Sequence, residues 1–137
     1  MARLNTEIEH NIFEVIRMLD KEKRNLLIGV CKDLTFDQLK PFVKSAREYI
    51  DKETTHFVMI SIDDKTGLNG NLIGEGWSVV PLDINSREQI HMERFKYVNE
   101  YLQRYPNYDK VISCDVRDII FQADPFICMN GIFADAY

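Results

Sequence analysis

The sequence has few cysteines, and none of them pair closely along the chain. The three present, Cys31, Cys114 and Cys128, are widely separated and form no CxxC motif. A zinc ribbon or a dithiol redox site is therefore not indicated. Cys31 and Cys114 each end an apolar run, which is typical of small buried side chains rather than nucleophiles. An odd number of cysteines without a dense framework is typical of a reducing compartment.

Long hydrophobic runs and an excess of basic residues are also lacking. No run approaches the roughly 20 apolar residues that a membrane-spanning helix needs, and the first ten residues lack the apolar core of a signal peptide. The net charge of -5 argues against a general nucleic-acid binder, which usually carries a basic stripe. We therefore expect no transmembrane segment, no nucleic-acid partner and a cytoplasmic location.

Two glycine motifs of nucleotide-binding proteins are missing. The segment 65–76 contains Gly67, Gly70, Gly74 and Gly76, but not in the GxxxxGK[ST] order of a P-loop. The first strand-like run lacks GxGxxG, which disfavours a Rossmann dehydrogenase. Because the segment 65–76 is polar and rich in glycine, we expect it to be a flexible loop.

What is present is the composition of one globular domain. The chain has 137 residues, of which 45% are hydrophobic and 28% are charged, so it can bury a proper core. Apolar residues at helical spacing predict an amphipathic helix within residues 1–24, leading into a domain over residues 25–137. Such a helix most often packs on the domain that follows, and a partner-binding or membrane-surface role is the alternative.

The rest of the chain alternates between strand and helix patterns. Apolar, β-branched runs predict four buried strands, and amphipathic spacing predicts two helices between them. This alternation predicts an α/β fold with a mainly parallel sheet and helices on both faces. The strands are expected at residues 25–31, 57–62, 77–82 and 111–114, and the helices at about 38–50 and 86–105.

The second helix has the clearest start signal. Ser86 and Gln89 have the spacing of a capping box. The residues expected to face the sheet from this helix are Phe95, Val98, Leu102 and Tyr105. Trp77, which begins the third strand pattern, is expected in the core.

Acidic residues follow three of the four predicted strands. Asp33 follows the first, Asp63 and Asp64 follow the second, and Asp115 and Asp118 follow the fourth. Since the carboxyl ends of parallel strands share one edge of a sheet, these side chains can converge there. Carboxylates at that edge can bind ribose hydroxyls or a base, and Mg²⁺ or Mn²⁺ held by them can neutralise a diphosphate. The alternative is that they cap turns or form structural ion pairs.

The segment around the fourth strand resembles a known family. Residues 109–126 read DKVISCDVRDIIFQADPF, which is similar to the central segment of nucleotide-diphospho-sugar glycosyltransferases of the GT-A fold. These enzymes carry a DxD-type motif after a hydrophobic strand, and a subset has a variant close to DVRDVxFQxDPF. The preceding helix, with His91 and Arg94, resembles the same subset, and the likeness spans roughly residues 25–126.

The resemblance implies a Rossmann-like nucleotide-sugar domain that transfers a sugar from a nucleotide donor to an unidentified acceptor, helped by a divalent cation. It implies that Asp115 binds metal and ribose, that Asp118 is a second metal anchor, and that Asp63 contacts the nucleoside. The catalytic residues stay unassigned. The residues expected around the donor are Asp33, Asp63, His91, Arg94 and Arg117.

Two departures from the family pattern matter. Arg117 occupies the position of the second acid of DxD, where it cannot bind a cation but can neutralise the diphosphate itself. The cation, Mn²⁺ or Mg²⁺, would then be weakly required or dispensable. The family's acceptor pocket lies downstream of this motif, so we expect a domain truncated at its C-terminus. If the chain is part of a eukaryotic enzyme, the Golgi is the alternative location.

Two other functions share parts of this sequence pattern. A haloacid-dehalogenase-like phosphatase also runs a strand into DxD, but Asp115-Val116-Arg117 lacks the second acid that such an enzyme needs as general acid. A non-catalytic module that binds a nucleotide sugar or a partner shares the predicted fold and lacks turnover. That second alternative stays open.

Overall fold

The computed structural model describes residues 23–84, 90–128 and 133–136. Within these ranges five strands form one sheet, in the order β3-β2-β1-β4-β5, and every neighbouring pair is parallel. The strands are β1 (Arg24–Lys32), β2 (Thr55–Ile62), β3 (Ser78–Leu82), β4 (Tyr108–Cys114) and β5 (Phe133–Ala136). The helices are α2 (Phe36–Tyr49), α3 (Leu68–Gly74), α4 (Ile90–Arg104) and the short 3₁₀ helix η1 (Pro125–Cys128).

The strand order contains one reversal of direction. The chain proceeds outward from β1 to β2 and β3, then returns across the sheet to β4 on the other side of β1. This is the order of a Rossmann-like sheet, and its switch point lies between β1 and β4. The predicted α/β class with a parallel sheet is confirmed.

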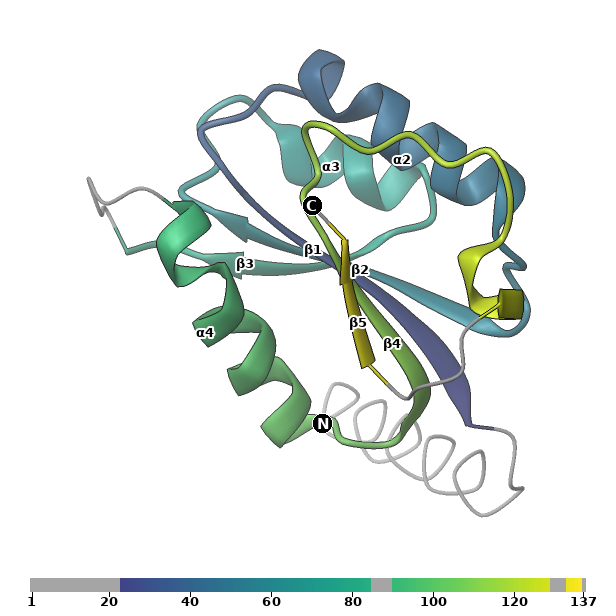
Figure 1. Cartoon of the computed structure of the whole chain (residues 1–137). Helices are drawn as coiled ribbons and strands as arrows, with labels where there is room; N and C mark the ends of the chain where they lie inside the picture. Colours follow the sequence, from purple (N-terminus) through teal and green to yellow (C-terminus); the bar gives the residue numbers. More distant parts are fainter. Residues whose placement is uncertain (1–22, 85–89, 129–132, 137) are drawn as a thin grey trace, which may run out of the picture.

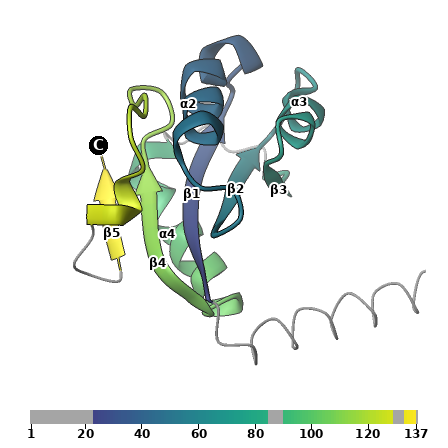
Figure 2. The ribbon, with the colours of Figure 1, turned by 90° about the vertical axis from the view of Figure 1, so that its right-hand side faces the viewer.

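Helices cover both faces of the sheet, as Figures 1 and 2 show. α2 and α3 lie on one face, and their core includes Leu27, Phe42 and Trp77. α4 lies on the other face, over a core that includes Leu26 and Val58. Because both faces are covered, β1 and β2 are buried along nearly their whole length.

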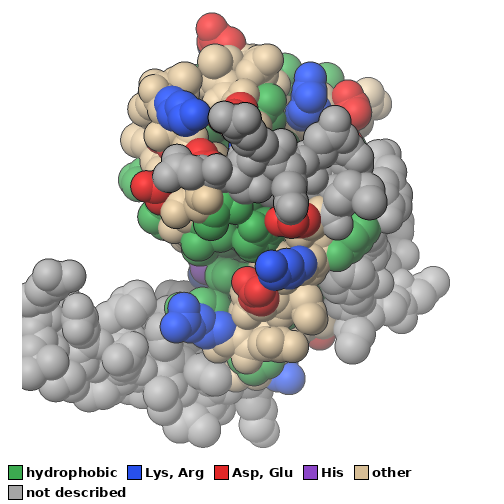
Figure 3. Space-filling view, turned by 90° about the vertical axis from the view of Figure 1, so that its left-hand side faces the viewer, with side chains coloured by type: hydrophobic (Ala, Val, Ile, Leu, Met, Phe, Trp, Pro, Cys, Tyr) green, Lys and Arg blue, Asp and Glu red, His purple; other side chains and the backbone are tan. Residues whose placement is uncertain are grey.

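The edge strand β3 lies on the side of the molecule that Figure 3 views, where hydrophobic side chains gather among charged ones. Its side chains are only partly buried or exposed. Pro81 lies within this strand and has no N–H group to donate. A proline in an edge strand makes it a poorer template for pairing with another chain.

Segment 65–76 is not the loop expected from its glycines, because residues 68–74 form α3. The Asp64 carboxylate accepts hydrogen bonds from the N–H groups of Leu68 and Asn69, at 3.1 and 3.0 Å. Leu68 and Leu72, one helical turn apart, are buried against the core. Capping and burial together offset the low helix propensity of glycine.

The start of α2 also differs from the prediction. The helix begins at Phe36, two residues before the expected start, because Thr35 and Gln38 form a capping box. Pro41 therefore lies inside the helix, where it removes one backbone hydrogen bond. Pro41 is exposed, so water can hydrogen-bond to the helix carbonyl that lacks its N–H partner.

The buried stripe of α4 is only partly the one predicted. Val98 and Leu102 pack against the core as expected, but Phe95 and Tyr105 are 40% and 51% exposed. Tyr97 and Arg94 are buried instead, at 8% and 6% exposure. Aromatic residues occur on two adjacent faces of this helix, so the spacing alone did not distinguish the buried aromatic side chains from the exposed ones. The capping box at residues 86–89 and residues 1–22 of the predicted helical segment 1–24 lie outside the described residues, and Arg24 at the end of that segment belongs to β1.

Candidate site at the carboxyl edge of the sheet

Two aspartates turn the chain at the ends of adjacent strands. Asp33 follows β1 and Asp63 follows β2, and both have left-handed backbones, with φ of 54° and 51°. Lys32 pairs with Ile62 in the sheet, so the two aspartates leave it side by side. Aspartate is among the few non-glycine residues that adopt this conformation readily.

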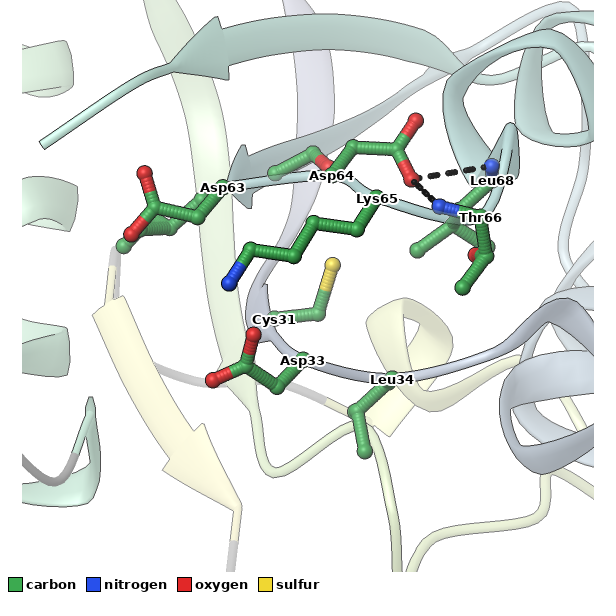
Figure 4. A pocket seen from close by; sticks show the side chains of 10 residues that line it. Cys31, Asp33, Leu34, Asp63, Asp64, Lys65, Thr66 and Leu68 are labelled. Carbon is green, nitrogen blue, oxygen red and sulfur yellow. Dashed lines mark hydrogen bonds between the residues drawn. The ribbon is translucent and has the colours of Figure 1, made fainter. Parts of the chain in front are cut away.

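A pocket of about 170 Å³ lies between these two strand ends. Figure 4 shows the Lys65 side chain pointing into the space between Asp63 and Asp33, with Cys31 deeper. The residues that line this pocket are Cys31, Asp33, Leu34, Ser61, Ile62, Asp63, Asp64, Lys65, Thr66 and Leu68. The only basic side chain among these is Lys65.

Asp63 and Asp64 do different structural work beside this pocket. Asp63 is 7% exposed, and its Oδ1 accepts a hydrogen bond of 2.8 Å from the N–H of Ile84. Its own N–H donates to the carbonyl of Leu82, which ties the ends of β2 and β3 together. Asp64 instead caps α3. Burial raises the pKa of its carboxyl, but hydrogen bonds from backbone N–H groups at the start of α3 have the larger combined effect, so the pKa is lowered.

The inner part of the pocket is a thiol beside a hydroxyl. Burial raises the pKa of the Cys31 thiol to about 12, although the neighbouring Ser61 hydroxyl opposes the rise. The thiol is therefore protonated at neutral pH and is no nucleophile. Ser61 is 1% exposed, and within the described part of the chain its Oγ has no hydrogen-bond partner stronger than the Cys31 thiol. A ligand in the pocket can supply a stronger one.

The DVRD motif lies on the other side of β1. Gly29 pairs with Cys114, so Asp115 stands beside Val30, three residues short of Asp33, which corresponds to about 10 Å along the strands. Asp115 Oδ1 accepts a 3.0 Å hydrogen bond from the N–H of Arg117 and so closes a tight turn. This position is the switch point of the sheet, where α/β proteins bind ligands.

The predicted site residues therefore fall into three places. Asp33 and Asp63 line the pocket, whereas Asp115, Arg117 and Asp118 do not. Arg117 and Asp118 are exposed beyond the end of β4. Arg94 is buried in α4, with its guanidinium 4.9 Å from the centre of the Phe95 ring. His91 belongs to α4, but its side chain lies outside the described residues.

Comparison with protein-family models, with curated proteins and with solved structures found no match. The GT-A resemblance therefore stays a prediction from the motif. Within the described ranges, no helix is long and apolar enough to cross a membrane. Nor do three or more His, Cys, Asp or Glu side chains in those ranges form a group that could hold a metal ion.

Sequence reasoning did not single out Lys65 or Ser61. Lys65 comes directly after the two acids that follow β2, so its position at the carboxyl edge could have been predicted. Ser61 interrupts the apolar run from Phe57 to Ile62. A lone polar residue near the end of a buried strand was the available signal for a group that faces a pocket.

Proposed function

We propose that this chain binds a nucleoside-diphosphate sugar at the carboxyl edge of its sheet and transfers the sugar to an acceptor. The observation that carries the proposal is the pocket between the Asp33 and Asp63 strand ends, in a sheet with the Rossmann-like order. Ligands of open α/β sheets bind outside the carboxyl ends of the strands. The resemblance of the DVRD segment to nucleotide-sugar enzymes supports the same assignment.

The volume of the pocket indicates which part of the donor it can hold. Whole small-molecule sites usually measure about 300–1,000 Å³, so a pocket of about 170 Å³ holds one part of the donor. In our proposal the nucleoside occupies it, near Asp33 and Asp63. The diphosphate then crosses the end of β1 towards Asp115 at the switch point.

A divalent cation fits this arrangement in a limited way. Because the described residues contain no cluster of three ligands, Asp115 or Asp118 would hold Mn²⁺ or Mg²⁺ together with the donor's phosphates, the usual arrangement for Mg²⁺. Such a cation stabilises the leaving diphosphate. Arg117, exposed in the turn that Asp115 closes, adds a positive charge at the same place.

Isothermal titration of the full chain with nucleoside-diphosphate sugars, with Mn²⁺ or with EDTA, tests the proposal. We expect saturable binding that weakens when a monophosphate replaces the diphosphate. Release of nucleoside diphosphate from the bound sugar donor then tests turnover. Binding without turnover supports the alternative, a non-catalytic nucleotide-sugar module. If no donor binds to a chain with a native circular dichroism spectrum, the proposed function is wrong.

A further inference from the structure

The polar groups of the β1–β2 pocket form a specific pattern of donors and acceptors. The Asp33 carboxylate and the Lys65 ammonium both face the pocket (Figure 4). Neither makes a hydrogen bond or ion pair within the described part of the chain. A carboxylate offers two acceptor oxygens side by side, and an ammonium offers only donors. The pocket therefore presents two adjacent acceptors and a donor.

A second observation indicates that a ligand completes this pocket. The Ser61 side chain is 1% exposed and lines the pocket, and the polar group beside its hydroxyl is the Cys31 thiol, a weak hydrogen-bonding group that leaves Ser61 without a strong partner in the described residues. Buried hydroxyl groups are normally hydrogen-bonded, because an unpaired one costs free energy. Asp63 is anchored by the Ile84 N–H group, so the pocket wall on that side is held in place.

Among the common nucleobases, guanine alone matches this pattern. Its ring N1–H and its N2 amino group are adjacent donors that can bind both oxygens of one carboxylate, and its O6 is an acceptor beside them. Uracil has a single donor between two acceptors. Adenine and cytosine have an amino donor next to a ring nitrogen acceptor. Paired hydrogen bonds to a carboxylate are among the strong ones in proteins.

We propose that the pocket selects guanine, with Asp33 accepting from N1–H and the N2 amino group and Lys65 donating to O6. This inference rests on the proposed function and specifies its donor as a guanosine-diphosphate sugar. A site built to hydrogen-bond a donor group discriminates strongly against an analogue without that group. The Asp33 carboxylate would lose one partner with hypoxanthine, which lacks only the N2 amino group.

The test is titration of the full chain with GDP, IDP, UDP, ADP and CDP in one buffer. We expect GDP to bind most tightly, and roughly ten- to hundredfold more tightly than IDP, the range for one hydrogen bond to a charged group. Two variants separate the two contacts. Asp33→Ala should weaken both GDP and IDP, since both contain N1–H, and should abolish the preference for GDP over IDP. Lys65→Met should weaken GDP and IDP alike, since both contain O6, and leave their ratio unchanged.

Matched controls are Asp109→Ala and Lys40→Met, which make the same charge changes at exposed positions outside the pocket. Both should leave the GDP to IDP ratio and the GDP affinity as in the parent. Equal affinities for GDP and IDP, or tightest binding of UDP, ADP or CDP, would overturn the guanine assignment while the nucleotide-binding proposal stands. Failure of all five nucleotides to bind a folded chain overturns both.

Discussion

Gly29 in β1 lies directly beneath the side chain of Val116 in the DVRD segment. A Cβ atom on Gly29 would clash with Cγ1 of Val116 and would lie 3.3 Å from the sulfur of Met59. Val116 is 3% exposed and is flanked by Asp115 and Arg117. The absence of a side chain at Gly29 therefore allows the turn after β4 to pack closely on the sheet.

Gly29→Ala should destabilise the fold and displace this turn. Overpacking a well-filled core by one methyl group costs about 1–3 kcal/mol, and urea denaturation measures the change in the free energy of unfolding. Gly70→Ala is the matched control, because nothing lies within 4 Å of the added Cβ and the residue is helical. It should be neutral or stabilise by up to about 1 kcal/mol. Equal effects of the two substitutions would contradict the packing argument.

The sheet was more predictable from the sequence than the helices packed on it. The apolar runs of β1 and β2 are strong signals because both faces of these strands are buried. By contrast, α3 is built around Leu68 and Leu72 among glycines, and its cap, Asp64, lies outside the usual N-cap position. Local propensity opposes this helix, so tertiary burial decides it.

The residue types of the site could be predicted from the sequence, but the distances between those residues could not. That acids follow the strands is visible in the sequence, and Asp33 and Asp63 do line one pocket. Asp115 stands to the side because β4 ends three residues earlier than β1 in their shared register. Register between strands far apart in the chain depends on packing that no local pattern reports.

The Tyr108 hydroxyl joins β2, β4 and α4 through hydrogen bonds. It lies 2.8 Å from His56 Nδ1 and 2.8 Å from the Tyr101 hydroxyl, and His56 Nε2 lies 2.8 Å from Ser78 Oγ. Tyr108→Phe should therefore cost about 1–3 kcal/mol, because it removes both hydrogen bonds of this hydroxyl, each worth roughly 0.5–1.5 kcal/mol. Thermal and urea denaturation measure the loss. Tyr49→Phe, at a position 45% exposed, should have no measurable effect. A Tyr108→Phe protein as stable as the parent would show that the hydroxyl chain contributes nothing.

Asp64 should make stability depend on acidity. Burial raises the pKa of its carboxyl, but backbone N–H groups, including those of Asn69 and Thr66, more than compensate, so the net pKa is below 3.8. The folded state thus favours the ionised carboxylate, and its stabilisation is present above pH 3.8 and is lost as pH falls through the lower folded pKa. Asp64→Ala should cost about 0.5–2 kcal/mol at pH 7, as for a helix cap. Urea denaturation of both proteins from pH 7 to pH 2.5 should show this difference shrinking below pH 3.8; a constant difference would rule out the carboxylate as its source.

Cys31 should affect stability at the alkaline end. Burial raises the pKa of its thiol from 9.0 to about 12, so above pH 9 the unfolded chain loses this proton while the folded chain keeps it. The stabilisation is complete below pH 9.0 and is lost as pH rises towards 12. Under reducing conditions, the parent should therefore lose stability more steeply than Cys31→Ala over about 2 pH units, from roughly pH 8.5 to roughly pH 10.5. Parallel curves for the two proteins would contradict a protonated, buried thiol.

Asp115 allows the charge of the motif to be separated from its turn. Asp115→Ala removes both the carboxylate and the acceptor for the Arg117 N–H, whereas Asp115→Asn removes the charge and keeps an acceptor oxygen. If the carboxylate meets a cation and the donor's diphosphate, both variants should lose nucleotide-sugar binding by at least about tenfold while the chain stays folded. Asp109→Asn, at an exposed position near the start of β4, makes the same charge change and should bind as the parent does. Retention of binding by Asp115→Asn, with loss in Asp115→Ala, would assign this residue to the turn alone, and binding by both would remove it from the site.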